Sequence, residues 1–291
     1  MMHPQPKHFL LQPAKFRLDG GSMYGIIPKP LWEKLSPPDE LNRIDLALRL
    51  WLIQDGERLI LTDTGIGDSP NEKFSKRFDV RGPENPLERS LNEIGFRCEN
   101  VTDLIISHLH FDHVGGLGRQ GSPLFPNARL HLHKNHYEYA HNPTARDTGS
   151  FHSQVFDPLI DWYEQHNQIV WHQGLQGELI PLSDGPLMFR CSHGHTPFLM
   201  HPYNKDYIYL ADLIPTAHHI HIPWVMAYDI SPGETTKDKQ NFLEFIQEKN
   251  LTLIFEHDVD SWGATIETDI KKGFKASQIF KAQERSAHLI D

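Results

Sequence analysis

The sequence lacks the features that mark secreted, membrane-spanning and thiolate-based metal proteins. Among 291 residues there are only two cysteines, Cys98 and Cys191, and they are too far apart to form a metal-binding motif. We therefore expect two free thiols in a reducing compartment. No uninterrupted apolar run is long enough to cross a bilayer, and residues 1–6 lack the cationic and apolar regions of a secretory signal. These absences predict a cytoplasmic protein with no membrane partner.

An excess of basic residues is also missing. The chain has 28 Lys and Arg against 38 Asp and Glu, a formal net charge of −10. Nucleic-acid-binding proteins normally carry a basic face or stripe, so this balance disfavours a nucleic-acid partner. Hydrophobic residues at 38% and charged residues at 23% are ordinary for a globular protein. No shift in composition divides the chain, which is long enough to bury a substantial core.

Histidine, in contrast, is abundant, and its densest cluster follows an apolar segment at 104–106. Three imidazoles and one carboxylate lie within six residues: His108, His110, Asp112 and His113. Alternate side chains of an extended segment point the same way, so His108 and His110 can reach one metal ion. Asp112 and His113, past the bend, then face a neighbouring ion. The alternative, a histidine-rich surface loop, is disfavoured because later segments supply further ligands.

Two of these later segments lie in the middle of the chain. The glycine-flanked turn at 192–197 can project one imidazole into a site, and we select His195, with His193 as the competitor. The apolar segment 207–210 predicts a buried strand that ends just before Asp212. A carboxylate at that point can bridge two cations that would otherwise repel each other.

Two more candidates follow predicted strands at 251–255 and 58–61. His257 comes directly after the first of these and is the natural last ligand of the second ion. Asp63 comes after the other strand. We interpret it as an acceptor for a metal-binding imidazole, with a turn-capping aspartate as the alternative.

The rest of the pattern predicts mixed strands and helices. We expect further strands at 8–18, 44–52, 128–133, 169–171 and 187–191, with a hairpin turn at 55–56. We expect a helix between Asn85 and Gly95, a helix capped by Thr235 or Thr236, a mostly helical insertion at 134–166 and a long amphipathic helix over 263–291. Residues 19–25 are expected to form a glycine-rich loop.

Taken together, these motifs resemble the metallo-β-lactamase fold superfamily over nearly the whole chain. The resemblance is carried by His-x-His-x-Asp-His at 108–113, Gly-His-Thr at 194–196, Asp212 and His257. Three stretches, 18–32, 211–216 and 224–229, are similar to the YtnP-type quorum-quenching lactonases, relatives of the N-acyl-homoserine lactone hydrolases and of organophosphate-hydrolysing members. The resemblance implies an α/β fold, a four-layer αββα sandwich. Residues 1–291 would form one such domain, with the helical insertion at about 134–166.

The resemblance also implies a dinuclear metal site. His108, His110 and His195 would hold one ion, Asp112, His113 and His257 the other, and Asp212 would bridge them together with a hydroxide. The ions are expected to be two divalent cations, zinc first, with manganese, iron or cobalt as alternatives. Asp112 would also be catalytic, by moving a proton during the reaction.

The expected substrate-binding residues rest on the same resemblance. From the residues alone, Met23 and Tyr24 suggest packing under a loop, and the resemblance makes them pocket-lining candidates together with Phe111 and Trp224. Some related hydrolases place a substrate-contacting Tyr where this chain has Pro215, so the group that polarises the substrate carbonyl is open, with Tyr24 as one candidate. Phe198 replaces the usual glycine after His-Thr-Pro, which predicts a differently shaped turn.

The expected function is hydrolysis of N-acyl-homoserine lactones or related lactones by a metal-bridging hydroxide. The partner would be a small lactone or ester, and a homodimer is a possible assembly. The alternative is a phosphotriesterase, or an ester or thioester hydrolase of the same superfamily. A non-catalytic metal-binding protein is disfavoured by the full ligand set. A redox di-iron enzyme is disfavoured because His110 stands where a further acidic ligand would be expected.

Overall fold

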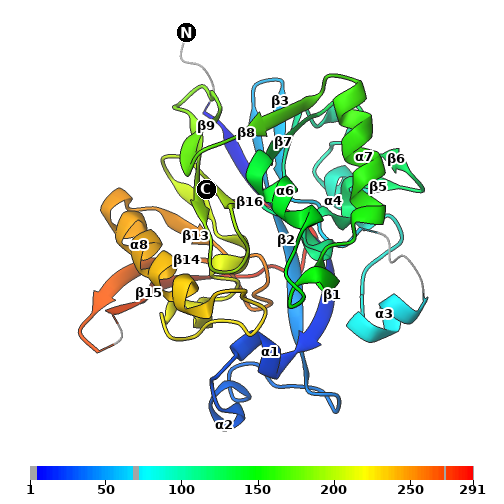
Figure 1. Ribbon diagram of the computed structural model, residues 1–291. Coiled ribbons are helices and arrows are strands. Elements are labelled where there is room, and N and C mark those ends of the chain that lie inside the picture. Colours follow the sequence, from blue (N-terminus) through cyan, green and yellow to red (C-terminus); the bar gives the residue numbers. More distant parts are fainter. Residues whose placement is uncertain (1–4, 68–71, 272, 291) are drawn as a thin grey trace.

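The computed structural model describes residues 5–67, 72–271 and 273–290. Two seven-stranded sheets pack face to face, with helices on their outer faces (Figure 1). The predicted four-layer αββα arrangement is therefore confirmed. No helix in the described part of the chain has the length and apolar character needed to span a membrane.

The first sheet has the strand order β16-β1-β2-β3-β4-β7-β8. In chain order its strands are β1 (Lys7–Asp19), β2 (Arg43–Asp55), β3 (Arg58–Thr62), β4 (Asp103–Ile105), β7 (Arg129–His133), β8 (Ile169–His172) and β16 (Ala287–Ile290). Strands β3, β4, β7 and β8 run parallel to one another. The register of β1 on β2 shifts between Leu11 and Ala14, next to Pro13, because proline cannot donate a backbone hydrogen bond.

The second sheet has the order β15-β14-β13-β12-β11-β10-β9. Its strands are β9 (Gln176–Ile180), β10 (Leu187–Ser192), β11 (Leu199–Tyr203), β12 (Tyr207–Tyr209), β13 (Thr252–Ile254), β14 (Ser261–Asp269) and β15 (Gly273–Lys281). Strands β12 and β13 run parallel to each other. A small separate ribbon joins β5 (Gly118–Arg119) to β6 (Ser122–Pro123).

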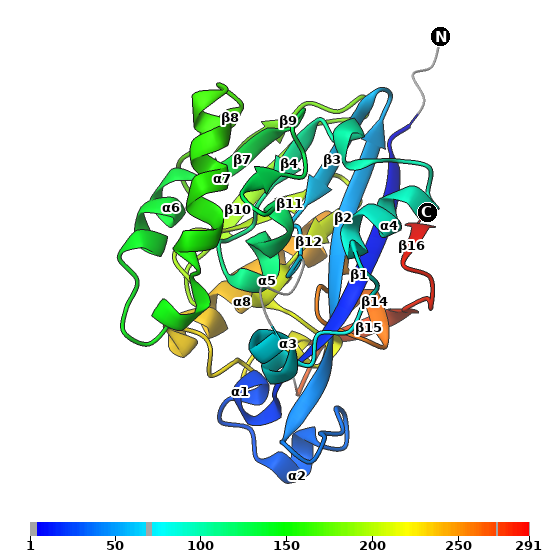
Figure 2. The same ribbon diagram turned by 90° about the vertical axis from the view of Figure 1, so that its right-hand side faces the viewer.

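The helices form the two outer layers and the loops at the sheet edge. They are α1 (Gly20–Tyr24), α2 (Lys29–Trp32), α3 (Glu72–Phe78), α4 (Pro86–Glu93), α5 (Phe111–Val114), α6 (Lys134–His141), α7 (Ser153–Gln165) and α8 (Pro232–Lys249). Short 3-10 turns lie at Cys98–Asn100, Gly115–Leu117, Thr148–Ser150, Ala211–Leu213 and Ala217–Ile220. Helices α4, α6 and α7 cover the first sheet (Figure 2), and α8 packs on the second.

The largest apolar core lies between the two sheets. Trp51, Ile53 and Ile60 of the first sheet pack there with Tyr209 and Leu253 of the second. A second core fills the space between the first sheet and the helices that cover it. Because the first sheet is covered on both sides, β2 is buried almost along its whole length. Apolar residues at every second position, as over 44–52, are on their own typical of a strand with one buried face.

The predicted C-terminal helix is wrong. Residues 263–291 contain most of β14, together with β15 and β16, and β14 and β15 form an antiparallel hairpin. Gly273 has φ +77°, a conformation that glycine adopts without strain and that suits a hairpin turn. The apolar residues there alternate weakly because β15 is an edge strand with one exposed face. The expected loop at 19–25 is also wrong: residues 20–24 form α1, capped by the Asp19 carboxylate, which accepts from the backbone N–H of Ser22.

Candidate metal centre

The candidate ligands come from both sheets and meet at one edge of the sandwich. The loop after β4 carries the first four of them, the β10–β11 turn carries His195, and the segments after β12 and β13 carry Asp212 and His257. Parallel strands β4, β12 and β13 all end at this edge, as is usual for sites in layered α/β folds. Residues 149 positions apart in the chain, from His108 to His257, thus become neighbours.

The first group comprises His108, His110, His195 and Asp212. All four are buried, and one ligand atom from each lies within 4.8 Å of the others. Nε2 of His195 lies 3.1 Å from Nδ1 of His110 and 3.1 Å from Oδ2 of Asp212. Nε2 of His108 lies 3.7 Å from the same carboxylate oxygen. This is a tight set of nitrogen and oxygen donors of the kind that zinc prefers.

The second group comprises Asp112, His113 and His257, whose ligand atoms again lie within 4.8 Å of one another. Nε2 of His257 is 3.8 Å from Oδ2 of Asp112, and Nε2 of His113 is 3.9 Å from Oδ1 of the same residue. Asp212 stands between the two groups: its Oδ1 lies 3.0 Å from His257, while its Oδ2 faces His195. One carboxylate therefore contacts both groups, as a bridging ligand does.

Four of the five imidazoles are held through their other ring nitrogen. Nδ1 of His108 contacts the Ser107 hydroxyl at 3.0 Å, and Nδ1 of His195 contacts Oδ1 of Asp229 at 2.9 Å. Nδ1 of His257 donates to the Ala47 carbonyl at 2.8 Å. Such contacts fix each ring with Nε2 pointing into the site, which is the usual arrangement around protein-bound metal ions.

His113 is held by two buried carboxylates. Its Nδ1 lies 3.1 Å from Oδ2 of Asp63 and 3.1 Å from Oε2 of Glu256. Asp63 also accepts hydrogen bonds from the backbone N–H and the hydroxyl of Ser107, at 2.7 and 2.6 Å. Burial raises the pKa of Glu256 to about 7, although His113 opposes the shift. Asp63 thus fixes the loop that carries His108 as well as the ring of His113.

Three buried ring nitrogens fit a bound cation. Nε2 of His108, of His110 and of His113 has no hydrogen-bond partner in the described structure. An orphaned buried polar atom is costly unless something else binds it. Burial, reinforced by neighbouring imidazoles, holds the pKa of His108 and of His110 well below the ordinary value, so both are neutral and offer lone pairs. The residues present therefore fit a metal.

The electrostatics of the cluster also favour positive charge. Burial alone would lower the pKa of His195 and of His257, but Asp212 and the adjacent carboxylates raise both to about 9. Burial would raise the pKa of Asp212, yet the surrounding imidazoles hold it well below the ordinary value. The buried carboxylates thus attract cations, whether protons or metal ions.

Close backbone contacts explain the glycines of this site. A Cβ atom on Gly115 would lie 2.3 Å from the Ile66 carbonyl oxygen, and one on Gly116 would lie 2.3 Å from that of Thr64. The turn that carries His195 has a non-glycine residue in a conformation usual for glycine: Phe198 has φ +59°. Its ring stacks on His133, with the centroids 4.8 Å apart. Phe198 therefore adopts the backbone conformation that glycine would, and its ring gains an aromatic contact with His133.

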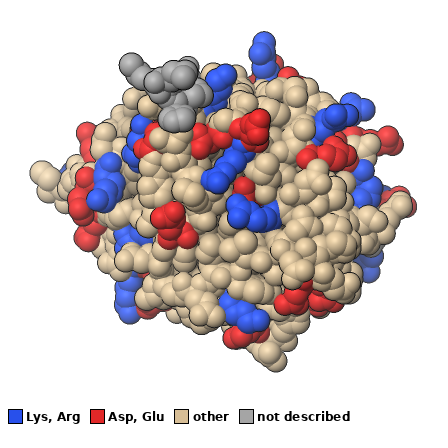
Figure 3. Space-filling view, turned by 90° about the horizontal axis from the view of Figure 1, so that it is seen from above, with Lys and Arg blue, Asp and Glu red and all other residues tan. Residues whose placement is uncertain are grey.

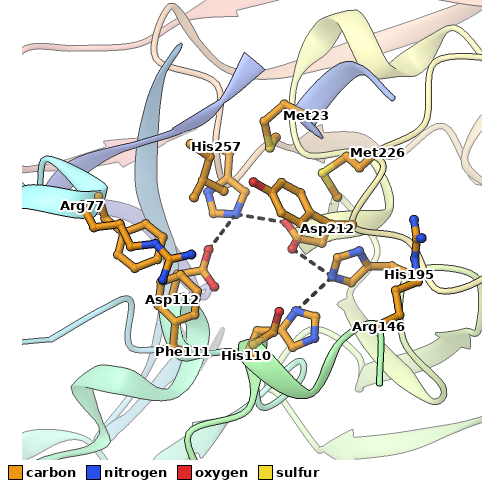
Figure 4. A pocket seen from close by; sticks show the side chains of 15 residues that line it. Met23, Arg77, His110, Phe111, Asp112, Arg146, His195, Asp212, Met226 and His257 are labelled. Carbon is orange, nitrogen blue, oxygen red and sulfur yellow. Dashed lines mark hydrogen bonds and ion pairs between the residues drawn. The ribbon is translucent and has the colours of Figure 1, made fainter. Parts of the chain in front are cut away.

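A cavity of about 290 Å³ opens onto both ligand groups (Figure 4). Its lining includes Asp112, Asp212 and His257 on the metal side, and Met23 and Phe111 on the apolar side. Further lining residues that the sequence did not suggest are Leu18, Arg77, Phe78, Arg146, Met226 and Tyr228. The cavity suits a small ligand with one polar end and one apolar end.

Two predicted substrate residues lie elsewhere. Tyr24 is fully buried, stacks between Trp32 and His219, and shares a hydrogen bond of 2.6 Å with the Ser36 hydroxyl. It does not line the cavity, so its suggested role in polarising a carbonyl does not fit this structure. Trp224 packs edge-on against Tyr24 and faces a different surface hollow. Tyr24 thus follows the interpretation from the residues alone, which was packing under a loop.

Two further histidines differ in their roles. His193, the rival of His195, contacts Phe198 and takes no part in either group. His136, which the sequence did not single out, is fully buried and joins two ligand loops: its Nε2 accepts from the Leu109 backbone N–H and its Nδ1 donates to the Pro197 carbonyl, both at 2.8 Å. Its wide spacing from other ligands gave no local signal.

Comparison with known proteins agrees with this geometry. The family model described as the metallo-beta-lactamase superfamily matches residues 50–257, which include all seven candidate ligands.

Among curated proteins, the chain is 27% identical over 179 residues to the N-acyl homoserine lactonase AttM of Agrobacterium fabrum. That match covers 59% of this chain and 64% of the relative, so the chain matches somewhat less than two thirds of the relative's length. An N-acyl homoserine lactonase of Bacillus cereus is 31% identical over 108 residues, covering 34% of this chain and 41% of that protein.

Solved structures share the fold along nearly the whole chain. A probable metal-dependent hydrolase from Staphylococcus aureus superposes with a TM-score of 0.83 at 23% identity, covering 97% of this chain and 99% of that one. AidC, described as a dizinc quorum-quenching lactonase in complex with a product, superposes with a TM-score of 0.71 at 21% identity, covering 95% of both chains.

Proposed function

The chain belongs to the metallo-beta-lactamase superfamily, and on this basis we propose that it is a metal-dependent hydrolase that opens N-acyl-homoserine lactones or closely related lactones. The observation that carries the proposal is the convergence of two ligand groups on one shared carboxylate, Asp212, at the floor of a cavity with an apolar wall. The similarity to proteins named N-acyl homoserine lactonases supports the choice of substrate.

We assign His108, His110 and His195 to one divalent ion and Asp112, His113 and His257 to the other, with Asp212 between them. Zinc suits this set of imidazole and carboxylate donors, and manganese, iron or cobalt are alternatives. Bound divalent cations supply a water nucleophile at neutral pH and polarise the carbonyl of an ester.

The chain's own residues have three tasks in this proposal. Asp112, on the cavity wall beside His257, accepts the proton released as water adds to the lactone carbonyl, and returns it to the ring oxygen when the C–O bond breaks. Met23, Met226 and Phe111 line the apolar side, where they pack against the acyl chain and exclude bulk water.

Tyr228 is our choice for the donor to the substrate carbonyl. Pro215, which stands where some relatives have a substrate-contacting Tyr, has no side-chain donor. Its carbonyl accepts the backbone N–H of His257 at 3.0 Å and so holds the segment that carries this ligand. Tyr228 lines the cavity, and burial raises its pKa to about 12 even though a hydrogen bond with Ser22 opposes the shift. The phenol therefore keeps its proton at neutral pH and can donate. Tyr228→Phe should lower kcat by about tenfold or more, the usual cost of losing one such donor.

A substrate panel tests the proposal. One zinc-loaded sample should open N-hexanoyl-homoserine lactone faster than it cleaves a simple γ-lactone, an aryl phosphotriester or a glutathione thioester, measured by proton release. Faster phosphotriester or thioester cleavage would replace lactone hydrolysis with the alternative activity. Asp212→Ala should abolish both turnover and the binding of two metal ions, and wild-type turnover in that variant would refute the arrangement.

A further inference from the structure

The cavity carries two arginines that lack carboxylate partners. Arg77 comes from α3 and Arg146 from the loop after α6, and the two lie on opposite sides of the cavity (Figure 4). The acidic residues of the lining are Asp112 and Asp212, both assigned to metal ions. Within the described part of the chain, no ion pair joins either arginine to a carboxylate.

Neighbouring arginines show the contrast. Arg17 and Arg81 share the carboxylates of Asp45 and Asp79 in a surface network close to α3. Elsewhere on the surface, acidic and basic side chains are interspersed, as on the face shown in Figure 3. The two cavity arginines differ from the network of Arg17 and Arg81 because they line the cavity, where no described carboxylate outside the two ligand groups neutralises them.

Both arginines are held in place. Arg43 donates to the backbone carbonyls of Lys76 and Arg77, each at 3.1 Å, which fixes the end of α3. The Arg77 guanidinium lies over the ring of Phe78, 5.3 Å from its centroid. Arg146 donates to the backbone carbonyls of Ala227 and Asp229, which leaves its charge without an opposing carboxylate. The Arg77 guanidinium beside an aromatic ring and the Arg146 guanidinium on two carbonyls both keep a positive charge that a ligand can meet.

We propose that the cavity selects substrates that carry an anionic group, a carboxylate or a phosphate, on the part of the molecule remote from the scissile ester, with Arg77 as its principal partner. The inference rests on the proposed lactonase function and narrows its substrate class. A neutral acyl chain would use the apolar wall but leave both guanidiniums unmatched. An anionic tail gains attraction from Arg77 and Arg146, and its approach is steered by the same field.

A pair of lactones that differ in one charge tests the inference. N-glutaryl-homoserine lactone ends in a carboxylate, and the corresponding glutaramyl compound ends in a carboxamide of nearly the same shape. Wild-type protein should show a KM about fivefold lower for the carboxylate at low salt, with similar kcat, because a partly exposed charge pair contributes modestly. The preference should shrink at high salt.

Variants assign the effect to Arg77. Arg77→Gln should remove most of the preference, and Arg77→Lys, which keeps the charge, should retain it. Arg89→Gln is the matched control, because Arg89 is an exposed arginine on α4, another short surface helix, and does not line the cavity. Equal KM values for the two lactones in wild-type protein, or equal losses for both lactones in Arg77→Gln, would overturn the inference.

A binding measurement separates this inference from the proposed activity. The cyclopentylamides of glutaric acid and of glutaramic acid contain no ester and cannot be turned over. Calorimetry measures the affinity of each for the zinc-loaded and the metal-free protein, and the difference between the two amides reports the contribution of the arginines. The acid should bind about fivefold more tightly, and Arg77→Gln should abolish the difference. If neither lactone is opened but the acid still binds better, the lactonase proposal fails and the charge preference stands. If the two amides bind equally, the charge preference fails.

Discussion

Replacing His136 by Phe should destabilise the protein and weaken its metal site at once. The imidazole joins the loop after β4 to the β10–β11 turn through two hydrogen bonds, with the Leu109 N–H and the Pro197 carbonyl. Phenylalanine keeps a ring in the space but leaves the buried Leu109 N–H unpaired, at a cost of about 1–3 kcal/mol. The partly buried Pro197 carbonyl adds about 1 kcal/mol. We therefore expect a loss of about 3 kcal/mol in the free energy of unfolding.

Urea unfolding of the metal-free protein measures the change in the free energy of unfolding, and competition with a chelator measures the affinity for zinc. His136→Gln should recover much of both, because its amide can accept from one loop and donate to the other. His141→Phe is the control on the same helix: its ring is partly exposed and bonds to Tyr137 and Asp157, so a loss under about 1 kcal/mol is expected. If His136→Phe unfolds within 1 kcal/mol of wild type, or no more easily than the control, the reasoning is refuted.

Three further outcomes are expected. Asp63→Ala should weaken zinc binding by about 10- to 100-fold in chelator competition, because His113 keeps only Glu256 of its two carboxylate partners and Ser107 loses its acceptor; unchanged affinity would contradict the assigned role. Chelation of the zinc-loaded protein should lower Tm in calorimetry, because bound metal stabilises only the folded state; an unchanged Tm would argue against a metal in the cluster. Acid should destabilise the protein through His136, His201 and His219, because burial lowers their pKa values to about 4, 3 and 3. Their contribution is complete above pH 6.5 and is lost as the pH falls toward these values, so urea midpoints that stay flat between pH 7 and 4 would contradict it.

The parts of the fold that the sequence predicted were those with strong local patterns. Strand β2 and the hairpin at Asp55–Gly56 were legible because apolar residues alternate and the turn residues are distinctive. The strands over 261–290 were misread as a helix because β15 lies at the edge of its sheet, and its exposed residues blur the alternation. Burial of β2 on both faces could not be predicted from its sequence, because it depends on the helices and the second sheet that cover it.

The candidate ligands were found because four of them share one short motif and the others follow buried strands. Residues that reach the site only through contacts with distant parts of the chain gave no such signal in the sequence. His136 contacts residues 27 and 61 positions away, and Arg77 reaches the cavity only because α3 packs beside the metal loop. The aromatic stack of Tyr24 likewise depends on His219, far along the chain. Tertiary contacts of this kind are set by the folded arrangement and not by local spacing.

Arg49 has a consequence for how the chain is made. It is fully buried in β2, yet it donates to the carbonyls of Phe255 and Asp258, residues 206 and 209 positions later. During synthesis on the ribosome, this guanidinium can bond to Gln12 early, but its two carbonyl partners emerge only 206 and 209 residues after it. A nascent protein truncated before residue 255 would hold a charged group at the centre of an unfinished first sheet, and such fragments should be ready clients of chaperones and proteases.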